Sequence, residues 1–479
     1  MSVSLGELLV RERLITAEQL NAALTRQRTR GGRLGDALVA LGAISADDLN
    51  RLFHSVPPVP RKVVETGLSD TFLVDLMLKI VYFEGGVFSL KDLSHKICLP
   101  LGVVDELAEL AKTDHLIAVR SGGSYSRLSY VFELTAQGRE RSEKALQQSQ
   151  YTGPAPVPLR PYCLMVAHQT VRQIEVDADW VKQAMSQLVI SKTLLEQLGT
   201  AFNSGRSIFL YGPAGTGKSS ISEALGRALA GDIYIPHAIE VDGQIIRVFD
   251  PAIHMTVDGD KRDANAPLDL ESDFKHDPRW CLCHRPVVMV GGELTLDGLN
   301  LEYDPISKFY ECPAHMKAAN GVFILDDFGR QQVPPRQLLN RWMVPLERGT
   351  DFLQLHNGKK LEVPFDQITI FCTNLSPGEL VDQAFLRRIR HKIQVPHQTE
   401  DEFLEILRRV CEIQGLHYVP RAADYLVKTY YRAKGRPFVG SHPRDLMEHI
   451  IDRARFMHQV PDLSNEAIDA AAASYFVDL

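Results

Sequence analysis

The sequence has no excess of positive charge, no long apolar run and few cysteines. Its 479 residues carry a formal net charge of −7, which gives no electrostatic reason to expect a general binder of nucleic acid or of acidic membranes. No apolar run approaches the ~20 residues needed to span a bilayer, and we do not expect a transmembrane protein. The seven cysteines are scattered, which is typical of a reducing compartment rather than of a disulfide framework.

A secretion signal is also missing. The first residues, MSVSLGELLVRERL, are amphipathic and do not form the basic, apolar and cleavage regions of a signal peptide. We therefore expect a cytoplasmic protein. The composition is that of a globular chain, with 45% hydrophobic and 24% charged residues, and the length predicts about three domains.

The most informative segment is residues 207–220, SIFLYGPAGTGKSS, which contains the complete G-x-x-x-x-G-K-[ST] pattern of a phosphate-binding loop. The apolar residues before the loop are typical of a buried parallel strand. The residues after Lys218 have helical spacing and end at Gly231. A loop between a strand and a helix N-terminus binds phosphate oxygens through its backbone N–H groups. We expect ATP to be held by Gly212, Pro213, Ala214, Gly215, Thr216, Gly217, Lys218, Ser219 and Ser220.

Two side chains of this loop have separate expected roles. Lys218 should reach the β- and γ-phosphates of ATP, and the hydroxyl of Ser219 should bind Mg²⁺.

Four later segments carry polar residues beside regular patterns: two at the ends of apolar strands, one ahead of an apolar stretch and one at the start of a helix. These are Asp326 and Asp327 in GVFILDDFGR, Asn374 in ITIFCTN, Arg387 and Arg388 in AFLRRIRHKI, and Arg444 in GSHPRDL. In this order they resemble the Walker A, Walker B, sensor 1, arginine finger and sensor 2 motifs of AAA+ ATPases, over roughly residues 165–460.

The resemblance implies a role for each residue. Asp326 would organise Mg²⁺ together with Ser219, and Asp327 would polarise the attacking water, which Asn374 would help to position. It further implies that Arg387 and Arg388 reach the γ-phosphate of a neighbouring subunit.

Arg444 would contact the phosphates of its own subunit and couple the helical lid to the nucleotide. Assembly into a ring, for which a hexamer is typical, follows from a finger that acts between subunits.

Asp327 departs from the family pattern, in which the second acid is usually Glu. Its side chain is one methylene shorter, so we expect slow hydrolysis. On sequence alone, an Asp327→Glu variant should match or exceed the wild-type rate.

The stretch between the phosphate loop and Asp326 is longer than one βαβ unit needs. Its Gly-Gly turn at 291–292 and its aromatic residues Phe309 and Tyr310 could line the pore of a hexamer.

After Asp326, the segment PLERGTDFLQLHNGKKLEVPFDQITIF resembles the hairpin insertion of the MoxR and enhancer-binding-protein branch of AAA+ proteins.

Residues 1–56 contain an internal repeat with an offset of 29 residues, from Ser4 to Arg33. Each copy has a capping-box start, Thr16 with Gln19 and Ser45 with Asp48. The repeat resembles the N-terminal domain (MshEN type) of type IV pilus and type II secretion ATPases, which can bind cyclic di-GMP.

Only the second copy keeps the Arg-Leu-Gly opening of that family, at Arg33, and the first copy has Ser4 there. Half of the basic phosphate contact is therefore missing. The alternatives are a cyclic di-GMP site and a helical module that docks a protein.

Residues 68–150 follow the order helix, helix, helix, hairpin, helix, which is a winged-helix pattern. Such a domain could bind DNA through the second helix of its helix–turn–helix pair. Residues 61–150 contain 11 Lys and Arg against 12 Asp and Glu, and the helix VVDELAELAKTD is acidic. We therefore expect docking to a protein rather than to nucleic acid.

The predicted fold class is multidomain α/β: a helical repeat, an α+β winged helix, and a P-loop AAA+ core with a helical lid. The expected segments are a helical repeat at 1–56, linkers at 57–67 and 151–164, a winged helix at 68–150, an ATPase core at 165–397 and the lid at 398–479.

Zinc is not expected as a cofactor. Cys281, Cys283 and His284, with Cys312 and His315, form C-x-C-H and C-x-x-H patterns, and neither is a standard zinc-finger spacing. The alternative is a set of buried free thiols.

The sequence thus favours a cytoplasmic, ring-forming AAA+ ATPase that uses ATP and Mg²⁺ and is recruited to a pilus, secretion or motility assembly. Two alternatives remain: a nucleotide-dependent switch or scaffold with little hydrolysis, and a DNA-binding regulator.

Overall fold

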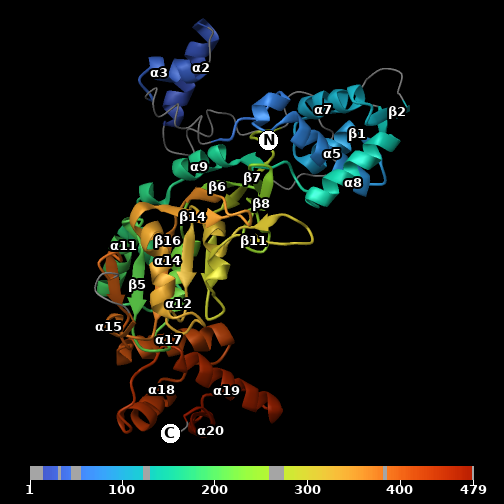
Figure 1. Cartoon of the computed structure of the whole chain (residues 1–479). Coiled ribbons are helices and arrows are strands. Elements are labelled where there is room, and N and C mark those ends of the chain that lie inside the picture. The colour runs from blue at the N-terminus through green and yellow to red at the C-terminus, as the bar shows by residue number, and fades with distance from the viewer. Residues whose placement is uncertain are drawn as a thin grey trace. The chain divides into compact units, whose positions relative to one another are not determined.

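The computed structural model shows a mixed α/β protein (Figure 1). It describes residues 15–30, 34–44, 56–121, 130–257, 274–380 and 386–476. The chain divides into two compact units: unit 1 is Met1–Gln169, Asp232–His284 and Leu301–Cys312, and unit 2 is Thr170–Gly231, Arg285–Asn300 and Pro313–Leu479.

This division differs from the contiguous core that we predicted for residues 165–397. The chain leaves unit 2 after Gly231 and again after Asn300. The sequence shows apolar strands in both segments but does not show which sheet each strand joins, so the two excursions were not apparent.

The N-terminal repeat is described in part. Helices α2 (Ala17–Arg30) and α3 (Leu34–Ala40) surround a small core that includes Ala23 and Leu38. The first predicted capping box is confirmed, because Gln19 N donates to Thr16 Oγ1 and Thr16 N donates to Gln19 Oε1. Ser4, Arg33 and the second pair, Ser45 and Asp48, lie outside the described residues.

Residues 68–150 fold as helices around a small antiparallel sheet with the strand order β1-β3-β2. Its elements are α5 (Asp70–Phe83), β1 (Val87–Ser89), α6 (Leu90–Ile97), α7 (Leu101–Thr113), β2 (Ile117–Ser121), β3 (Val131–Leu134) and α8 (Ala136–Gln148). Ser69, Ser89 and Thr135 cap the N-termini of α5, α6 and α8 with their hydroxyls. The predicted order of elements is therefore present, with one further short strand before α6.

The two predicted linkers are packed rather than free. The first contains the 3₁₀ helix η1 (Val63–Thr66), in which Val63 is 2% exposed. In the second, Ala155 is fully buried and its N–H donates to the carbonyl of Ile97. The prolines in these segments suggested spacers, but the apolar residues between them gain more from burial than from exposure.

The excursions from unit 2 form strands that complete unit 1. A five-stranded sheet has the order β11-β12-β8-β7-β4, and β6 pairs with β9 in a separate ribbon. Together with α9 (Leu159–His168), the elements are β4 (Val157–Pro158), β6 (Asp232–Pro236), β7 (Ala238–Val241), β8 (Gln244–Arg247), β9 (Trp280–His284), β11 (Glu302–Tyr303) and β12 (Tyr310–Glu311).

A buried ion pair joins the parts of unit 1. Arg279 is 5% exposed and its guanidinium binds the carboxylate of Asp277 at 2.8 Å. Its Nη1 also donates to the carbonyls of Thr66 and Pro156. One arginine thereby connects the first predicted linker, the second predicted linker and the segment before β9.

Unit 2 is built on a five-stranded parallel sheet with the order β10-β13-β16-β5-β17. The strands are β5 (Ile208–Tyr211), β10 (Val287–Val290), β13 (Val322–Leu325), β16 (Ile368–Thr373) and β17 (His391–Gln394). Further elements are η3 (Val171–Gln173), α10 (Ala178–Ala184), α11 (Lys192–Asn203), α12 (Lys218–Arg227), η4 (Asp297–Leu299), α13 (Ala314–Lys317), α14 (Pro335–Arg348), the hairpin β14 (Thr350–Gln354) with β15 (Lys360–Pro364), and α15 (Pro377–Leu380).

Both faces of this sheet are buried, which explains the continuous apolar strands. Ile370 of β16 belongs to the core beneath α11 and α12. Phe371, the next residue, packs against Phe328 and against Trp342 of α14 on the other face. Parallel strands covered by helices on both sides have this composition.

The C-terminal helices form a separate core within unit 2 (Figure 1). They are α17 (Glu400–Gln414), α18 (Pro420–Leu426), the π-helix η5 (Val427–Arg432), α19 (His442–Phe456) and α20 (Asn465–Tyr475). A complete capping box of Thr399 and Glu402 starts α17, directly after the last strand of the sheet.

Candidate functional site

The predicted phosphate loop joins β5 to α12, as the sequence indicated. Gly217 is the N-cap of α12 and has a φ of 90°, a conformation that glycine adopts without strain. The loop turns there so that the N-terminus of α12 faces the ends of the neighbouring strands. This arrangement presents backbone N–H groups and the positive end of the helix dipole to an anion.

Lys218 is nearly buried and directs its ammonium group at three oxygens. Nζ donates to the carbonyls of Gly212 and Pro213 at 3.0 and 2.7 Å, and to Oδ1 of Asn374 at 2.8 Å. Burial lowers the pKa of Lys218, and the neighbouring Cys372, Asp326 and Asp327 oppose that change. The cation is thus held at the ends of β5 and β16.

Ser219 and Asp326 are brought together although they are far apart in the sequence. The hydroxyl of Ser219 lies 2.8 Å from both carboxylate oxygens of Asp326. A hydroxyl and a carboxylate are hard oxygen ligands of the kind Mg²⁺ prefers. These two residues fit a magnesium ion and would hold it beside the loop.

Asp327 is exposed at the same edge of the sheet. Its Oδ1 accepts a hydrogen bond from Nδ2 of Asn374 at 3.0 Å. Its φ is 47°, in the left-handed region that Asp and Asn tolerate better than other non-glycine residues. A glutamate adopts this conformation at a greater cost than Asp, so we expect Asp327→Glu to hydrolyse ATP more slowly than wild type, rather than to match it as the sequence alone suggested.

The strand order explains why these side chains meet. Strand β16, which ends before Asn374, lies between β5 and β13. The carboxyl ends of parallel strands share one edge of the sheet, where ligands of open α/β sheets bind. Asn374 consequently lies between the phosphate loop and the two aspartates.

The two predicted finger arginines are placed differently. Arg387 is exposed, whereas the Arg388 side chain is 28% exposed and its Nε lies 3.3 Å from Glu347 of α14. Arg387 is therefore the more available of the two for a contact with another subunit.

Arg444 lies in the first turn of α19 and its side chain is 65% exposed. It forms long ion pairs with Asp445 and Glu448 on its own helix. The residue before α19 makes the direct contact with the loop, because Ser441 N donates to the carbonyl of Gly215 at 3.1 Å. The role that the resemblance implies for Arg444 stays a prediction.

A groove of about 710 Å³ starts beside the loop, at Ser220, and follows α12. Arg409 of α17 donates to the carbonyl of Ser186 in its wall at 2.8 Å. Its lining residues are Trp180, Gln183, Ala184, Ser186, Gln187, Leu188, Ser220, Glu223, Ala224, Arg227, Ala228 and Ala230. The groove thus reaches the first turn of α12, at the residue after Ser219.

The five cysteines and histidines weighed as zinc ligands have separate surroundings. His284 contacts Asp232, and Cys281 contacts His237 at 3.2 Å. His315, in unit 2, donates from Nε2 to the carboxylate of Asp351 at 2.9 Å. Among the described residues, no group of three or more His, Cys, Asp or Glu side chains is arranged for a metal ion.

The prediction of a pore residue is wrong for Tyr310, which is buried, and stays a prediction for Phe309, which is half-buried. Tyr310 is 1% exposed, and the ring of Phe309 packs edge-on against Tyr151 of unit 1. Leu294 and Leu299, which follow the Gly-Gly turn, are also buried. Tyr310, Leu294 and Leu299 therefore contribute to buried cores, whereas Ile306 in the same stretch is 75% exposed.

Sequence reasoning missed the residues that support the loop and the Asp327 turn. Gln398 donates from Nε2 to the carbonyl of Thr216 at 3.4 Å, and Gln331 bonds to the backbone around Asp327. Their signal is weak, since glutamines in loops are common. Only their positions, just after β17 and just after the two aspartates, could have suggested a role.

Comparisons with known proteins find partial matches. A domain of unknown function (DUF8689) matches residues 399–474, which comprise helices α17 to α20. The type IV pilus assembly ATPase PilB of Myxococcus xanthus is 47% identical over 60 residues, which is 12% of this chain and 11% of that protein.

Solved structures give distant likenesses. NtrX from Brucella abortus, in complex with ADP, has a TM-score of 0.36 at 15% identity and covers 69% of this chain and 65% of its own. The RuvB Holliday junction branch migration motor of Thermotoga maritima has a TM-score of 0.33 at 12% identity, over 60% of this chain and 70% of its own. These TM-scores are too low to support an inference about function, so the function proposed below depends on the geometry of the site. Within the described residues no helix is long and apolar enough to cross a membrane.

Proposed function

We propose that this protein binds and hydrolyses ATP as an AAA+ ATPase. One observation carries the proposal: five residues are hydrogen-bonded to one another at the carboxyl edge of a parallel sheet, with Asp327 N joining the two sets by donating to Asp326 Oδ1 at 3.0 Å. The two sets are Lys218, Asn374 and Asp327, and Ser219 with Asp326. These residue types and this placement supply the parts that phosphoryl transfer needs, a cation for the phosphates, oxygen ligands for Mg²⁺ and an acid for water.

Each residue then has a defined task. Lys218 exchanges its bonds to the loop carbonyls and to Asn374 for bonds to the β- and γ-phosphates. Ser219 and Asp326 hold Mg²⁺, which neutralises phosphate charge. Asp327 accepts the proton of the attacking water, and Asn374, already bonded to that carboxylate, orients it.

The groove along α12 accounts for the rest of the nucleotide. It begins at Ser220, the residue after the magnesium-binding serine. A nucleoside attached to phosphates in the loop would extend into it and contact Leu188 and Ala224.

Hydrolysis is proposed to require a ring, and the typical ring of this class is a hexamer. The observation in favour is the exposed Arg387, which has the chemistry of a finger that stabilises phosphate charge in trans. Arg388 supports it from its pair with Glu347.

Unit 1 is proposed to recruit the ATPase to a cytoplasmic face of a pilus, secretion or motility assembly. The repeat in residues 1–56 and the 60-residue match to a pilus assembly ATPase support this role. We interpret residues 68–150 as a winged helix that docks a protein. Glu106 on α7 accepts a hydrogen bond from Val63 N, so the acidic helix that would enter DNA is engaged by η1 instead.

A second candidate is a nucleotide-dependent switch or scaffold with little turnover, one that could also respond to cyclic di-GMP. The short side chain of Asp327 favours it. The two candidates are separated by turnover at saturating ATP, because a motor exceeds its own Asp327→Asn variant and a switch does not. A pull-down with the Asp327→Asn variant, which should retain its partner in the ATP state, then identifies what unit 1 binds.

A further inference from the structure

The side chain of Gln331 bonds to the backbone of the turn that presents Asp327. Gln331 is 9% exposed, and its amide nitrogen lies 3.2 Å from the carbonyl of Asp326 and 3.3 Å from that of Asp327. Its amide oxygen accepts from Gly329 N at 2.8 Å. The amide therefore bonds to both sides of the turn.

This turn is also fixed to the sheet. Phe328 N donates to the carbonyl of Cys372 on β16 at 2.7 Å, and the Phe328 ring is buried between Phe209 and Phe371. Between these anchors the backbone of Asp327 has a φ of 47°. A left-handed residue that is not glycine persists where its surroundings determine it.

We propose that Gln331 is a positioning residue that keeps the left-handed turn and thereby aims the carboxylate of Asp327 at the phosphate site. This inference rests on the proposed ATPase function. It also explains the identity of residue 327, because Asp and Asn adopt left-handed conformations at less cost than Glu. The short acid is matched to its turn rather than being a weakened glutamate.

The first test measures turnover and ATP affinity for Gln331→Met and Gln331→Glu. Both variants keep the volume of the side chain, and both lose the donation to the two carbonyls. We expect turnover to fall by about a hundredfold, as for a misplacement of roughly 1 Å, with ATP affinity within about twofold of wild type. Gln367→Met is the matched control, since Gln367 is equally buried but lies before β16, at the other end of that strand.

Wild-type turnover in both Gln331 variants, above that of Asp327→Asn, would overturn the inference and leave the proposed function standing. A loss in Gln331→Glu with full activity in Gln331→Met would also overturn it, because packing alone would then suffice.

The second test does not depend on turnover. In the wild-type background, Asp327→Glu should lower the melting temperature by about 2 °C more than Asp327→Asn. In a Gln331→Met background the turn can relax, and that difference should disappear. Strictly additive shifts would overturn the inference even if the chain hydrolyses no ATP. Should wild type and Asp327→Asn turn over equally, the proposed function fails, and the coupling in melting temperature alone decides whether Gln331 holds the turn.

Discussion

Lys218 and Asn374 are joined by a hydrogen bond of 2.8 Å from Nζ to Oδ1, although 156 residues separate them. The amide nitrogen of Asn374, Nδ2, donates a hydrogen bond to Oδ1 of Asp327. The residue expected to bind phosphate and the residue expected to activate water are therefore linked through a single side chain. A phosphate that attracts Lys218 would free Asn374 Oδ1 and leave its donation to Asp327 intact.

Removal of the Lys218 ammonium should weaken ATP binding. Lys218→Ala deletes a buried charge that is directed at the phosphate loop, and hydrogen bonds of charged groups contribute about 2 kcal/mol, which is roughly thirtyfold in Kd. Titration of a fluorescent ATP analogue with Mg²⁺ measures this. The matched control is Lys192→Ala, an exposed lysine at the start of α11, which should bind as wild type does. Equal Kd values for both variants would remove Lys218 from the site.

Arg387 should act between subunits and Arg388 within its own. Arg387→Ala is expected to abolish turnover without changing ATP affinity, because a trans finger acts on transition-state charge. Arg388→Ala should cost less, since Arg388 is paired with Glu347. The assay mixes inactive Arg387→Ala with inactive Asp326→Ala. Mixed rings contain interfaces with an intact finger and an intact magnesium site, so activity should return in part. Confirmed mixed oligomers without any activity would contradict a trans finger.

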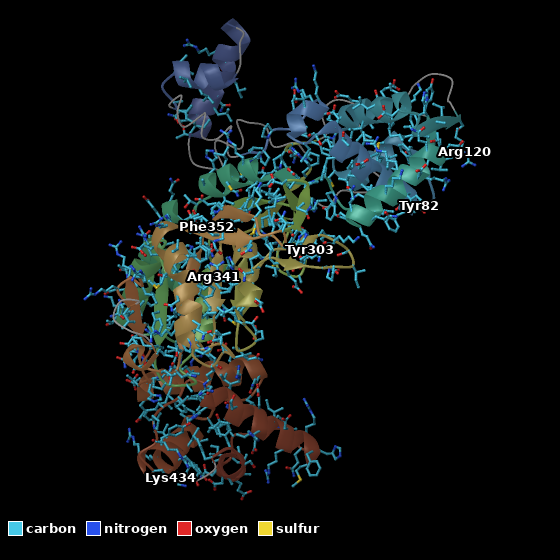
Figure 2. The ribbon with its side chains drawn as sticks, viewed as in Figure 1. Tyr82, Arg120, Tyr303, Arg341, Phe352 and Lys434 are labelled. Carbon is cyan, nitrogen blue, oxygen red and sulfur yellow. The ribbon has the colours of Figure 1, made fainter. Side chains whose placement is uncertain are left out.

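Asp351 should make the free energy of unfolding of unit 2 depend on pH in the acidic range. It is 1% exposed and binds His315 and Arg341. Arg341 also donates to the carbonyl of Phe352, and both residues are labelled in Figure 2. Burial alone would raise the pKa of Asp351, but the hydrogen bonds from His315 and Arg341 outweigh it and lower the pKa to about 2.

The folded pKa of Asp351 is thus below the unfolded value, and the stabilisation is present above that value. It amounts to about 2 kcal/mol and is lost as the pH falls from about 4 to about 2. The free energies of unfolding of wild type and Asp351→Asn, measured as a function of pH, should differ at neutral pH. This gap should narrow as the pH falls over this range. A gap of constant size would exclude the ion-pair account.

Arg279 should stabilise unit 1 without affecting the ATP site. Arg279→Met leaves Asp277 buried and unpaired, which costs about 3–5 kcal/mol. Hydrogen exchange should show lost protection around Thr66 and Pro156, whose carbonyls Arg279 binds, and unchanged protection in β5 and β16. Arg160→Met, an exposed arginine of α9, is the control. Loss of protection throughout unit 2 would show that the two units do not unfold separately.

The residues of the site that come directly after an apolar strand could be predicted from the sequence. The phosphate loop, the Asp326 pair and Asn374 each come after an apolar run, and parallel strands bring such ends to one edge of a sheet. A local pattern also predicted the helix start at Thr16, because a capping box is a short-range signal.

Long-range features were not predictable. Nothing near Arg279 in the sequence indicates that it binds carbonyls more than a hundred residues away. The left-handed backbone of Asp327 is set by Gln331 and Phe328, so the composition of the motif alone suggested a shortened acid. We predicted that residues 232–284 belong to the ATPase core, because the sequence of a strand does not indicate which sheet the strand joins.

The central claim is that Asp327 activates water for ATP hydrolysis. The most direct measurement is steady-state turnover of wild type and Asp327→Asn at saturating ATP and Mg²⁺, with ATP affinity measured on the same preparations. Asn adopts the left-handed turn as readily as Asp, so this substitution removes the charge and leaves the backbone in place. The account predicts a wild-type rate about a hundredfold or more above that of Asp327→Asn, at nearly equal affinity. Wild-type turnover equal to that of Asp327→Asn would contradict it.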